Sequence, residues 1–320
     1  MRILALVPGG IGDQILFFPT LATLKQTYPQ AQIDVLVEPR SKGAYRVCPS
    51  VSDVLVFDYK DRNGLADYLN LLGMIRDREY DIALTLGQRW AVGLLLWLNG
   101  ITTRVGYESP KSCLLTATVP LKTEQYAAEM YHDLLLGLGI QTPCPTPTIT
   151  VPKSDIDWAE ATQDRMGIRD TGYILIHGGS SQLAVTKGID KIYPPQNWSA
   201  IIADLQTKQP DVPIVVIKGP EDSALVGELL AKAPNLKVVS PPDIGKLAAF
   251  IAGANLMLCT DSAPMHLAIA VGTYTIALFG PTDAKKLVPP NSETCIPIQS
   301  PSKAIGDIAP VTVLEQIWRG

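Results

Sequence analysis

The chain has 320 residues, 47% of them hydrophobic, and a formal net charge of -4 at pH 7. This length exceeds the roughly 100–200 residues usual for one domain, so we expect two domains with separate cores. The 27 Lys and Arg residues are scattered and leave no basic footprint, which argues against nucleic-acid binding.

Cysteine usage indicates a reducing compartment. The five cysteines are widely spaced and include no Cys-x-x-Cys pair. This pattern predicts neither a disulfide framework nor a zinc site, and the cytoplasm fits it best.

The first part of the chain alternates short β-branched or leucine-rich runs with longer amphipathic stretches. Such a rhythm is typical of βαβ units in a parallel sheet. The apolar start breaks at Pro8, too early for the apolar region of a signal peptide. Expected strands are Ile3–Val7, Ile33–Val37, Val54–Phe57 and Ile82–Leu86, and expected helices are Gln14–Thr27 and Leu65–Arg76.

A glycine-rich turn, Pro8–Asp13, follows the first expected strand. Glycines at a helix N-terminus let the backbone approach a phosphate, as in dinucleotide-binding folds. The dinucleotide fingerprint fails here because Ile15 stands where its third glycine belongs, although Glu38 could imitate the ribose-binding acid. We therefore expect a loop that approaches another ligand. Its glycines are Gly9, Gly10 and Gly12.

Asp13 lies at the start of the helix after this turn. A carboxylate there could act as a general base toward a ligand bound at the loop. The alternative is that Asp13 only caps the helix, where the helix dipole favours its ionised form. The local sequence leaves both roles open.

The most apolar expected helix is Trp90–Leu98. It is shorter than the ~20 residues needed to span a bilayer, so it does not predict a transmembrane helix. A helix of the protein core is the favoured interpretation, and a membrane-surface contact is the alternative.

A Pro- and Thr-rich stretch, Thr142–Pro147, interrupts the rhythm, which then restarts. We expect a linker here, with one domain at residues 1–150 and a second doubly wound domain at residues 151–320. A last helix is expected at Val311–Trp318, and packing of residues 311–320 against the N-terminal domain is one option. Expected strands of the second domain are Tyr173–His177, Ile214–Ile217, Leu256–Cys259 and Tyr274–Leu278, and expected helices are Pro195–Thr207, Asp222–Lys232, Asp243–Ala252 and Pro264–Ala270.

Two acids near the linker, Asp155 and Asp157, resemble an acidic pair that could hold a metal. They lie at the start of a helical pattern, where acids suit the helix dipole. We interpret them as solvated acids of the first helical turn and expect no metal site.

Polar side chains follow several expected strands of the second domain, where open α/β sheets bind ligands. His177 leads into a small-residue loop with Ser180 and Ser181, whose hydroxyl and N–H groups could meet phosphate oxygens. Lys191 precedes the next helix and is either part of the same site or solvated. Glu221 could accept hydrogen bonds from a ribose or base, or serve as a first-turn acid.

The most informative segment is Asp261–His266, because strand, capping turn and helix follow without a spare residue. Either Asp261 or Ser262 can cap the helix, and Pro264 suits its first turn. The free N–H groups would receive a diphosphate, with His266 beside it as a donor. A diphosphate so held is a stabilised leaving group without a metal. By itself, His266 could equally be a hydrogen-bonded helix residue.

A tight turn, Gly280–Asp283, closes the next strand, with Thr282 or Asp283 as its capping residue. The chain has no GxSxG elbow, Walker A sequence or HExxH helix, so hydrolase, P-loop kinase and zincin readings lack their signatures.

In this order, the motifs resemble glycosyltransferase family 9, the heptosyltransferase family of lipopolysaccharide core assembly. The similarity runs from residue 3 to about residue 283. It rests on the GGIGD opening, the His177 loop, Lys191 before Tyr193-Pro194, Gly219-Pro220-Glu221, DSAPMH and FGPTD.

The resemblance implies an α/β GT-B fold, in which two Rossmann-like, doubly wound parallel-sheet domains face each other across a cleft. It implies an acceptor-side N-terminal domain, a donor-binding C-terminal domain and an inverting mechanism without metal or other cofactor. Asp13 resembles the family's general base, which deprotonates the acceptor hydroxyl. The residues that resemble its donor-binding set are Ser180, Ser181, Lys191, Glu221, Asp261, Ser262, Ala263 and His266.

Two departures from the family pattern bear on this set. Ala263 stands where the family often has glycine, and the segment Gln182–Asp190 is longer than expected. The second departure leaves open whether Lys187 or Lys191 meets the phosphates. The acceptor side offers only scattered basic candidates. These are Arg40, Lys42, Arg46, Arg89, Arg104 and Lys111.

The expected function is transfer of a sugar, ADP-heptose-like in its donor, to a cell-envelope glycolipid or polysaccharide such as a lipopolysaccharide core. A cytoplasmic protein with peripheral contact at the inner face of the membrane is compatible with this function. One alternative is a nucleotide-sugar epimerase of the same architecture. The other is a nucleotide-sugar-binding module without catalysis.

Overall fold

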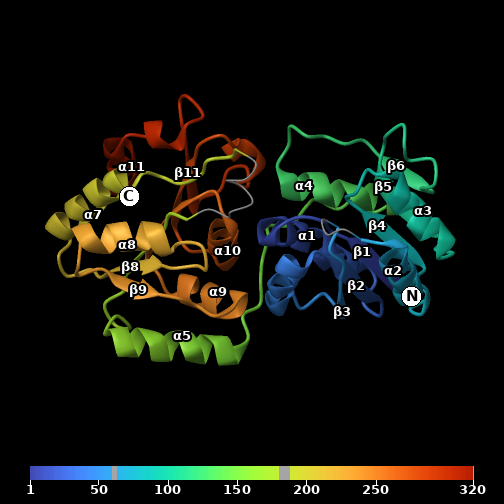
Figure 1. Cartoon of the computed structure of the whole chain (residues 1–320), viewed down its shortest axis with the longest axis horizontal. Helices are drawn as coiled ribbons and strands as arrows, with labels where there is room; N and C mark the ends of the chain where they lie inside the picture. The colour runs from blue at the N-terminus through green and yellow to red at the C-terminus, as the bar shows by residue number, and fades with distance from the viewer. Residues whose placement is uncertain (60–62, 180–187, 320) are drawn as a thin grey trace. The chain divides into compact units, whose positions relative to one another are not determined.

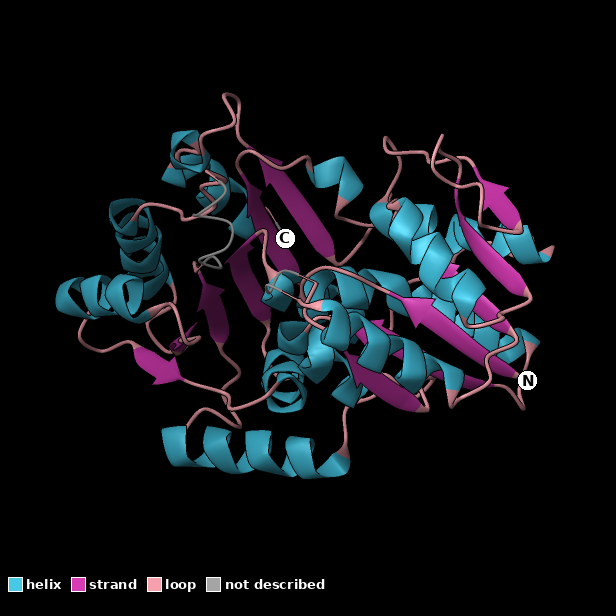
Figure 2. Ribbon diagram, turned by 45° about the vertical axis from the view of Figure 1, so that its right-hand side comes forward, coloured by secondary structure: helices cyan, strands magenta, loops and turns pink. Residues whose placement is uncertain are grey.

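The computed structural model describes residues 1–59, 63–179 and 188–319. The chain forms two compact units, Met1–Thr150 and Val151–Gly320. Within the described residues, each unit is built on a sheet of six parallel strands with helices on both faces (Figures 1 and 2). This architecture confirms the expected α/β class of parallel-sheet fold.

In the first unit, the strand order is β3-β2-β1-β4-β5-β6. The central strand β1 pairs with β2 through Ile3 and Ile33 and with β4 through Ile3 and Ile82. The strands are β1 (Arg2–Leu6), β2 (Gln32–Val37), β3 (Asp53–Val56), β4 (Ile82–Thr85), β5 (Thr103–Tyr107) and β6 (Ala117–Val119). The helical segments are α1 (Ile11–Thr27), η1 (Pro39–Val47), α2 (Leu65–Arg76), α3 (Trp90–Leu98), α4 (Ala127–His132) and η2 (Asp133–Leu138).

The second unit has the strand order β12-β11-β10-β7-β8-β9. The strands are β7 (Ile174–His177), β8 (Ile214–Ile217), β9 (Lys237–Val239), β10 (Leu256–Thr260), β11 (Thr275–Phe279) and β12 (Cys295–Gln299). The helical segments are α5 (Lys153–Met166), α7 (Pro195–Lys208), α8 (Ser223–Lys232), α9 (Ile244–Ala252), α10 (Ala263–Val271), η3 (Ala284–Lys286), η4 (Ile305–Asp307) and α11 (Pro310–Ile317).

The inner strands of the second sheet are mostly apolar because both of their faces are buried. Ile174, Ile176 and Leu258 point to the face covered by α7, α8 and α11. Leu175 and Met257, at the alternate positions, are also fully buried. Because the strands are parallel, the carboxyl ends of β7, β8, β10 and β11 lie at one edge of the sheet.

The last helix belongs to the core of the second unit. Val313 of α11 is fully buried in the cluster that contains α7, and Trp318 donates from Nε1 to Asp204 at 2.9 Å. Helix α11 therefore packs within the second unit through Val313, and the option that residues 311–320 also pack against the N-terminal domain stays a prediction. The apolar stripe of α11 is used against α7 and β11.

Helix α3 is less buried than its composition suggested. Gly93 and Leu96 are buried, but Trp90 and Trp97 expose more than half of their surface and Leu98 exposes 45%. The interpretation of α3 as a core helix is wrong for its exposed residues. A surface helix buries only one of its faces, and in α3 this face includes Gly93 and Leu96. No helix in the described part of the chain is both long and apolar enough to cross a bilayer.

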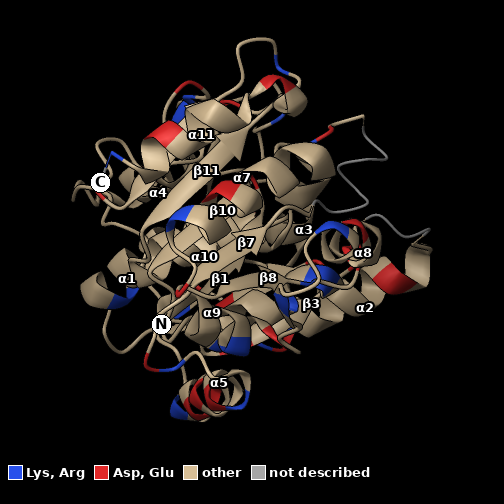
Figure 3. Ribbon diagram, turned by 90° about the vertical axis from the view of Figure 1, so that its left-hand side faces the viewer, with Lys and Arg blue, Asp and Glu red and all other residues tan. Residues whose placement is uncertain are grey.

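Helix α5 carries acidic and basic side chains along its length (Figure 3). Asp157 is exposed, as expected for a solvated acid, but it lies beyond the first turn and pairs with Lys153 at 2.8 Å. Asp155 is fully buried and lies 3.4 Å from Lys246, so its interpretation as solvated is wrong. Packing of α5 on α9 brings this lysine to the carboxylate, a pairing that the local sequence does not show.

Candidate functional site

The glycine-rich turn of the first unit is closed by Asp13. Helix α1 begins at Ile11, and the Asp13 carboxylate accepts the N–H of Gly10 at 2.7 Å through Oδ2. Its other oxygen, Oδ1, accepts the hydroxyl of Tyr131 at 3.3 Å. Asp13 therefore does cap its helix. Within the described residues, the contact of Oδ1 with Tyr131 is long, and Oδ1 retains a lone pair with which it could take a proton.

Burial, followed by the charge of Asp13, raises the pKa of Tyr131 well above its usual value. Tyr131 therefore stays a neutral hydroxyl that donates to Asp13 at neutral pH. This donation fixes the direction of the carboxylate at the start of α1.

Gly9 is the position of the turn that only glycine fits. Its φ is +120°, and a Cβ added there would lie 2.3 Å from Asp13 Oδ2. A backbone of this kind is strained for any residue with a side chain. The close approach of Gly9 and Asp13 thus depends on the missing side chain.

We expect Gly9→Ala to lower the free energy of unfolding by about 1–3 kcal/mol, because alanine adds backbone strain and displaces the Asp13 cap. Gly10→Ala is the matched control, since a Cβ there would lie 3.8 Å from Asp13 Oδ2, in ordinary contact. Urea denaturation of both variants measures the difference. Equal stability of the two variants would contradict this account of the turn.

A buried acid supports the same turn. Glu38 is 5% exposed, accepts the Gly9 N–H at 3.4 Å and pairs with Arg40 at 2.8 Å. Through its hydrogen bond with Gly9, Glu38 stabilises the glycine-rich turn. Arg40 is the basic candidate that lies at this turn, whereas Arg104 donates to the backbone carbonyls of Leu114 and Ile101.

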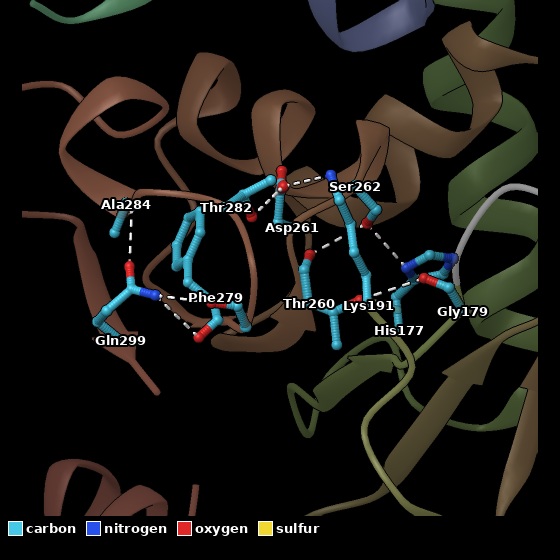
Figure 4. Close-up of polar contacts among 11 residues, drawn as sticks. His177, Gly179, Lys191, Thr260, Asp261, Ser262, Phe279, Thr282, Ala284 and Gln299 are labelled. Atoms are coloured by element: carbon cyan, nitrogen blue, oxygen red, sulfur yellow. Dashed lines mark hydrogen bonds and ion pairs between the residues drawn. The ribbon is translucent and has the colours of Figure 1, made fainter. Parts of the chain in front are cut away.

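In the second unit, side chains from several strand ends meet at the carboxyl edge (Figure 4). Lys191 lies 2.5 Å from Asp261 Oδ2, and the Thr282 hydroxyl donates to the same oxygen at 2.8 Å. Asp261 is 5% exposed, so this ion pair is largely shielded from water. Asp261 therefore acts as the partner of Lys191 and Thr282.

The turn Gly280–Asp283 is capped by one of its two expected residues. Asp283 accepts the N–H of Lys285 at the start of η3.

Ser262 occupies the N-cap position of α10 but makes no capping hydrogen bond with its side chain. Its Oγ lies 3.1 Å from His177 Nδ1 and 3.1 Å from the carbonyl oxygen of Thr260. The expectation that Ser262 caps the helix through its side chain is wrong, because His177 binds the hydroxyl. The side chain of Ser262 therefore does not cap the N-terminus of α10.

His177 is also close to Asp222, a residue that sequence reasoning undervalued. The His177 Nε2 atom lies 3.4 Å from Asp222 Oδ2, and the same oxygen accepts the Gly219 N–H at 2.7 Å. Burial raises the pKa of Asp222, but the hydrogen bond and charge of His177 outweigh it, so the pKa falls below its usual value. The nearby glycines, Gly179 and Gly219, were the sequence signal that could have identified Asp222.

The remaining predicted donor residues lie at different depths. Glu221 is exposed on the turn before α8, Ala263 is half-buried at the first position of α10, and His266 is 6% exposed on the same helix. At the carboxyl edge of the second sheet, Lys191 thus contacts Asp261, and Ser262 contacts His177. Ser180, Ser181 and Lys187 lie outside the described residues.

Residues 69–305 match the pattern of Glycosyltransferase family 9 (heptosyltransferase). The chain belongs to glycosyltransferase family 9. The matched range contains Lys191 and the segment Asp261–His266, whereas Asp13 lies before it. It contains no group of three or more His, Cys, Asp or Glu residues placed to hold a metal ion, within the part that the structure describes.

Two curated relatives differ in what their names say. Lipopolysaccharide heptosyltransferase 3 of Escherichia coli is 27% identical over 286 residues, which cover 85% of this chain and 81% of the relative. The chloroplastic photosynthetic NDH subunit of subcomplex B 1 of Arabidopsis thaliana is 26% identical and covers 100% of this chain and 74% of the relative.

Solved structures show the GT-B fold. ADP-heptose lipopolysaccharide heptosyltransferase II of E. coli matches with a TM-score of 0.80 at 20% identity, covering 99% of this chain and 97% of that chain. Heptosyltransferase WaaC of E. coli, solved with ADP-2-deoxy-2-fluoro heptose, matches with a TM-score of 0.76 at 18% identity, covering 100% and 99%. The family and the fold expected from the motifs are thereby confirmed.

Proposed function

We propose that this family 9 protein is an inverting, metal-independent glycosyltransferase that uses a nucleotide-diphosphate sugar of the ADP-heptose type. The observation that carries the proposal is the turn Asp261–His266, in which Ser262 at the N-cap of α10 makes no capping hydrogen bond with its side chain and Lys191 lies beside it at Asp261. Uncapped N–H groups and a lysine are the donors that an anionic diphosphate requires.

The second unit would hold the donor. The N-terminus of α10, with Ser262 and His266, would receive the diphosphate, and Lys191 would add a positive charge. We also assign Glu221, Ala263, Ser180 and Ser181 to donor binding. Stabilisation of the departing diphosphate by fixed donors lowers the barrier to its release.

The first unit would supply the base. As the acceptor hydroxyl oxygen attacks the anomeric carbon, Oδ1 of Asp13 would take its proton and the bond to the diphosphate oxygen would break. Attack opposite the leaving group inverts the anomeric centre. The glycines Gly9, Gly10 and Gly12 would let the acceptor approach this carboxylate.

The acceptor that fits this reading is a cell-envelope glycolipid or polysaccharide. Relatives in the family are named lipopolysaccharide heptosyltransferases, and an acceptor with a lipid part would bring the protein to a membrane surface. The exposed Trp90 and Trp97 of α3 support peripheral contact with such a surface, since tryptophan favours the membrane interface. The five free cysteines support a position in the cytoplasm.

A binding screen tests the central claim. ADP-, UDP- and GDP-sugars are each added at millimolar concentration while thermal unfolding is followed, because a ligand that binds only the folded state raises the midpoint. We expect ADP-sugars to protect most strongly. Product analysis with candidate acceptors follows. Failure of every nucleotide diphosphate to protect the chain would refute the proposal.

A second candidate function is a nucleotide-sugar-binding subunit without catalysis. It is favoured by the Arabidopsis relative, which is named as a subunit of a complex and aligns with the whole chain. ADP-sugar binding without transfer to any acceptor would support this candidate. An isomerised sugar formed without acceptor and without release of nucleotide would instead indicate an epimerase.

A further inference from the structure

Three polar side chains from separate segments form a hydrogen-bonded row at the carboxyl edge of the second sheet. Asp222 precedes α8, His177 ends β7 and Ser262 precedes α10. The distances along the row are 3.4 Å from Asp222 Oδ2 to His177 Nε2 and 3.1 Å from His177 Nδ1 to Ser262 Oγ. The row ends at Ser262, the N-cap residue of α10.

Asp222 is fixed in place from two sides. A Cβ on Gly179 would lie 1.8 Å from Asp222 Oδ1, and a Cβ on Gly219 would lie 2.8 Å from Oδ2. The carboxylate is 7% exposed and is bound by the Gly219 N–H. Two glycines thus make room for an acid that packs against the backbone. Its lowered pKa keeps it ionised at neutral pH.

An ionised carboxylate only accepts hydrogen bonds, so Asp222 requires a proton on His177 Nε2. The other nitrogen, Nδ1, then decides where the Ser262 hydroxyl proton points. In a neutral ring Nδ1 accepts this proton, and Ser262 keeps no donor for a phosphate. In an imidazolium ring Nδ1–H donates to Ser262 Oγ, and the hydroxyl proton turns away from the ring, toward the Thr260 carbonyl in this structure and toward a phosphate oxygen when a diphosphate is bound.

The surrounding charges favour the second state once an anion is bound. Lys191 is paired with Asp261, and Asp222 adds another carboxylate. Among these described side chains, the two acids Asp222 and Asp261 already outnumber the one cation, Lys191. A bound diphosphate adds further negative charge. Nearby negative charge stabilises the protonated form of an imidazole. Other titratable groups on the segments that meet here include Lys218, Glu221, Cys259 and His266.

We propose that Asp222 and His177 are positioning residues that couple donor binding to the uptake of one proton. The bound diphosphate holds His177 as an imidazolium, and its Nδ1–H turns the Ser262 hydroxyl toward a phosphate oxygen. The proton comes from solvent on binding and returns to it when the nucleotide leaves. The proposal rests on the proposed function, since it requires a diphosphate at the N-terminus of α10.

Isothermal titration calorimetry with ADP-glucose tests this coupling. ADP-glucose is a suitable probe because its diphosphate is esterified at both ends and does not titrate near neutral pH. Titrations in buffers of different ionisation enthalpy count the protons taken up. For the wild-type chain we expect an uptake of up to one proton, with an affinity that falls as pH rises, by up to about tenfold per pH unit.

The decisive variant is His177→Asn, whose side-chain amide can still donate to Ser262 Oγ but does not titrate. We expect it to bind ADP-glucose without proton uptake and with a pH-independent affinity. Ser262→Ala should also lose the uptake, because the hydroxyl that links ring and phosphate is gone. A merely structural histidine would weaken binding equally at every pH. Thermal melts of each variant establish that it is folded.

Two results would overturn the coupling alone: ADP-glucose binding without proton uptake by the wild-type chain, or uptake that persists in His177→Asn. Loss of uptake in His266→Asn with retention in His177→Asn would assign the proton to His266 and would likewise overturn it. Absence of binding by any nucleotide sugar would remove the proposed function together with this inference.

Discussion

Replacement of Asp13 by asparagine should slow sugar transfer by about 10²–10⁴-fold, the usual contribution of a general base. Asparagine can still accept the Gly10 N–H that Asp13 accepts at 2.7 Å, so the start of α1 is preserved. It cannot take a proton from the acceptor. The affinity for an ADP-sugar should stay unchanged, since we assign donor binding to the second unit.

The chain supplies a matched control for this substitution. Asp67 accepts the Gly64 N–H at 2.8 Å at the start of α2, with the same spacing of three residues. Asp67→Asn should change stability as little as Asp13→Asn and leave the transfer rate at the wild-type value. Rates are measured as nucleotide release with acceptor present. Transfer at the wild-type rate by Asp13→Asn would reduce Asp13 to a helix cap.

Replacement of Lys191 by alanine should have two separable effects. It leaves Asp261 shielded from water without its cation, which should cost about 3 kcal/mol of folding free energy. It would also remove the proposed charge-assisted contact to the diphosphate, worth about 1.5–3 kcal/mol, or about 10- to 100-fold in the dissociation constant. Thermal unfolding and ADP-sugar calorimetry measure the two effects.

The double variant Lys191→Ala/Asp261→Asn separates these effects, because a neutral amide needs no cation beside it. Stability should recover toward the wild-type value while the affinity stays weak. Lys187→Ala serves as the comparison for binding. If Lys187→Ala weakens ADP-sugar binding and Lys191→Ala does not, Lys187 meets the phosphates and Lys191 serves only Asp261.

Most of the fold was predictable because it follows from local patterns. The strand Ile214–Ile217 and the helix Leu65–Arg76 were predicted with the bounds that the structure has. Strands β5, β6, β9 and β12 were missed, since β6 and β9 have only three residues each and β5 and β12 carry polar residues with a glycine or a proline. Edge and near-edge strands need less apolar surface, so their signal is weak.

The candidate site was predictable in its members and less so in their contacts. Lys191, Asp261 and Ser262 were singled out because they follow strands whose carboxyl ends share one edge. Their partners were not: Ser262 binds His177, 85 residues away in sequence, where it was expected to cap α10. The local sequence also did not distinguish two neighbouring acids. Glu221 is exposed, whereas Asp222 is buried against Gly179 and Gly219.

The amino-acid sequence by itself determined the alternation of apolar runs, the glycine turn before Asp13 and the helix start at Asp261–Pro264. These features depend on residues a few positions apart, which interact through backbone geometry and side-chain period. The tertiary structure decided that β7 lies beside β10, which brings His177 to Ser262 and Lys191 to Asp261. Such pairings follow from strand order and burial, which join distant segments and leave no local pattern.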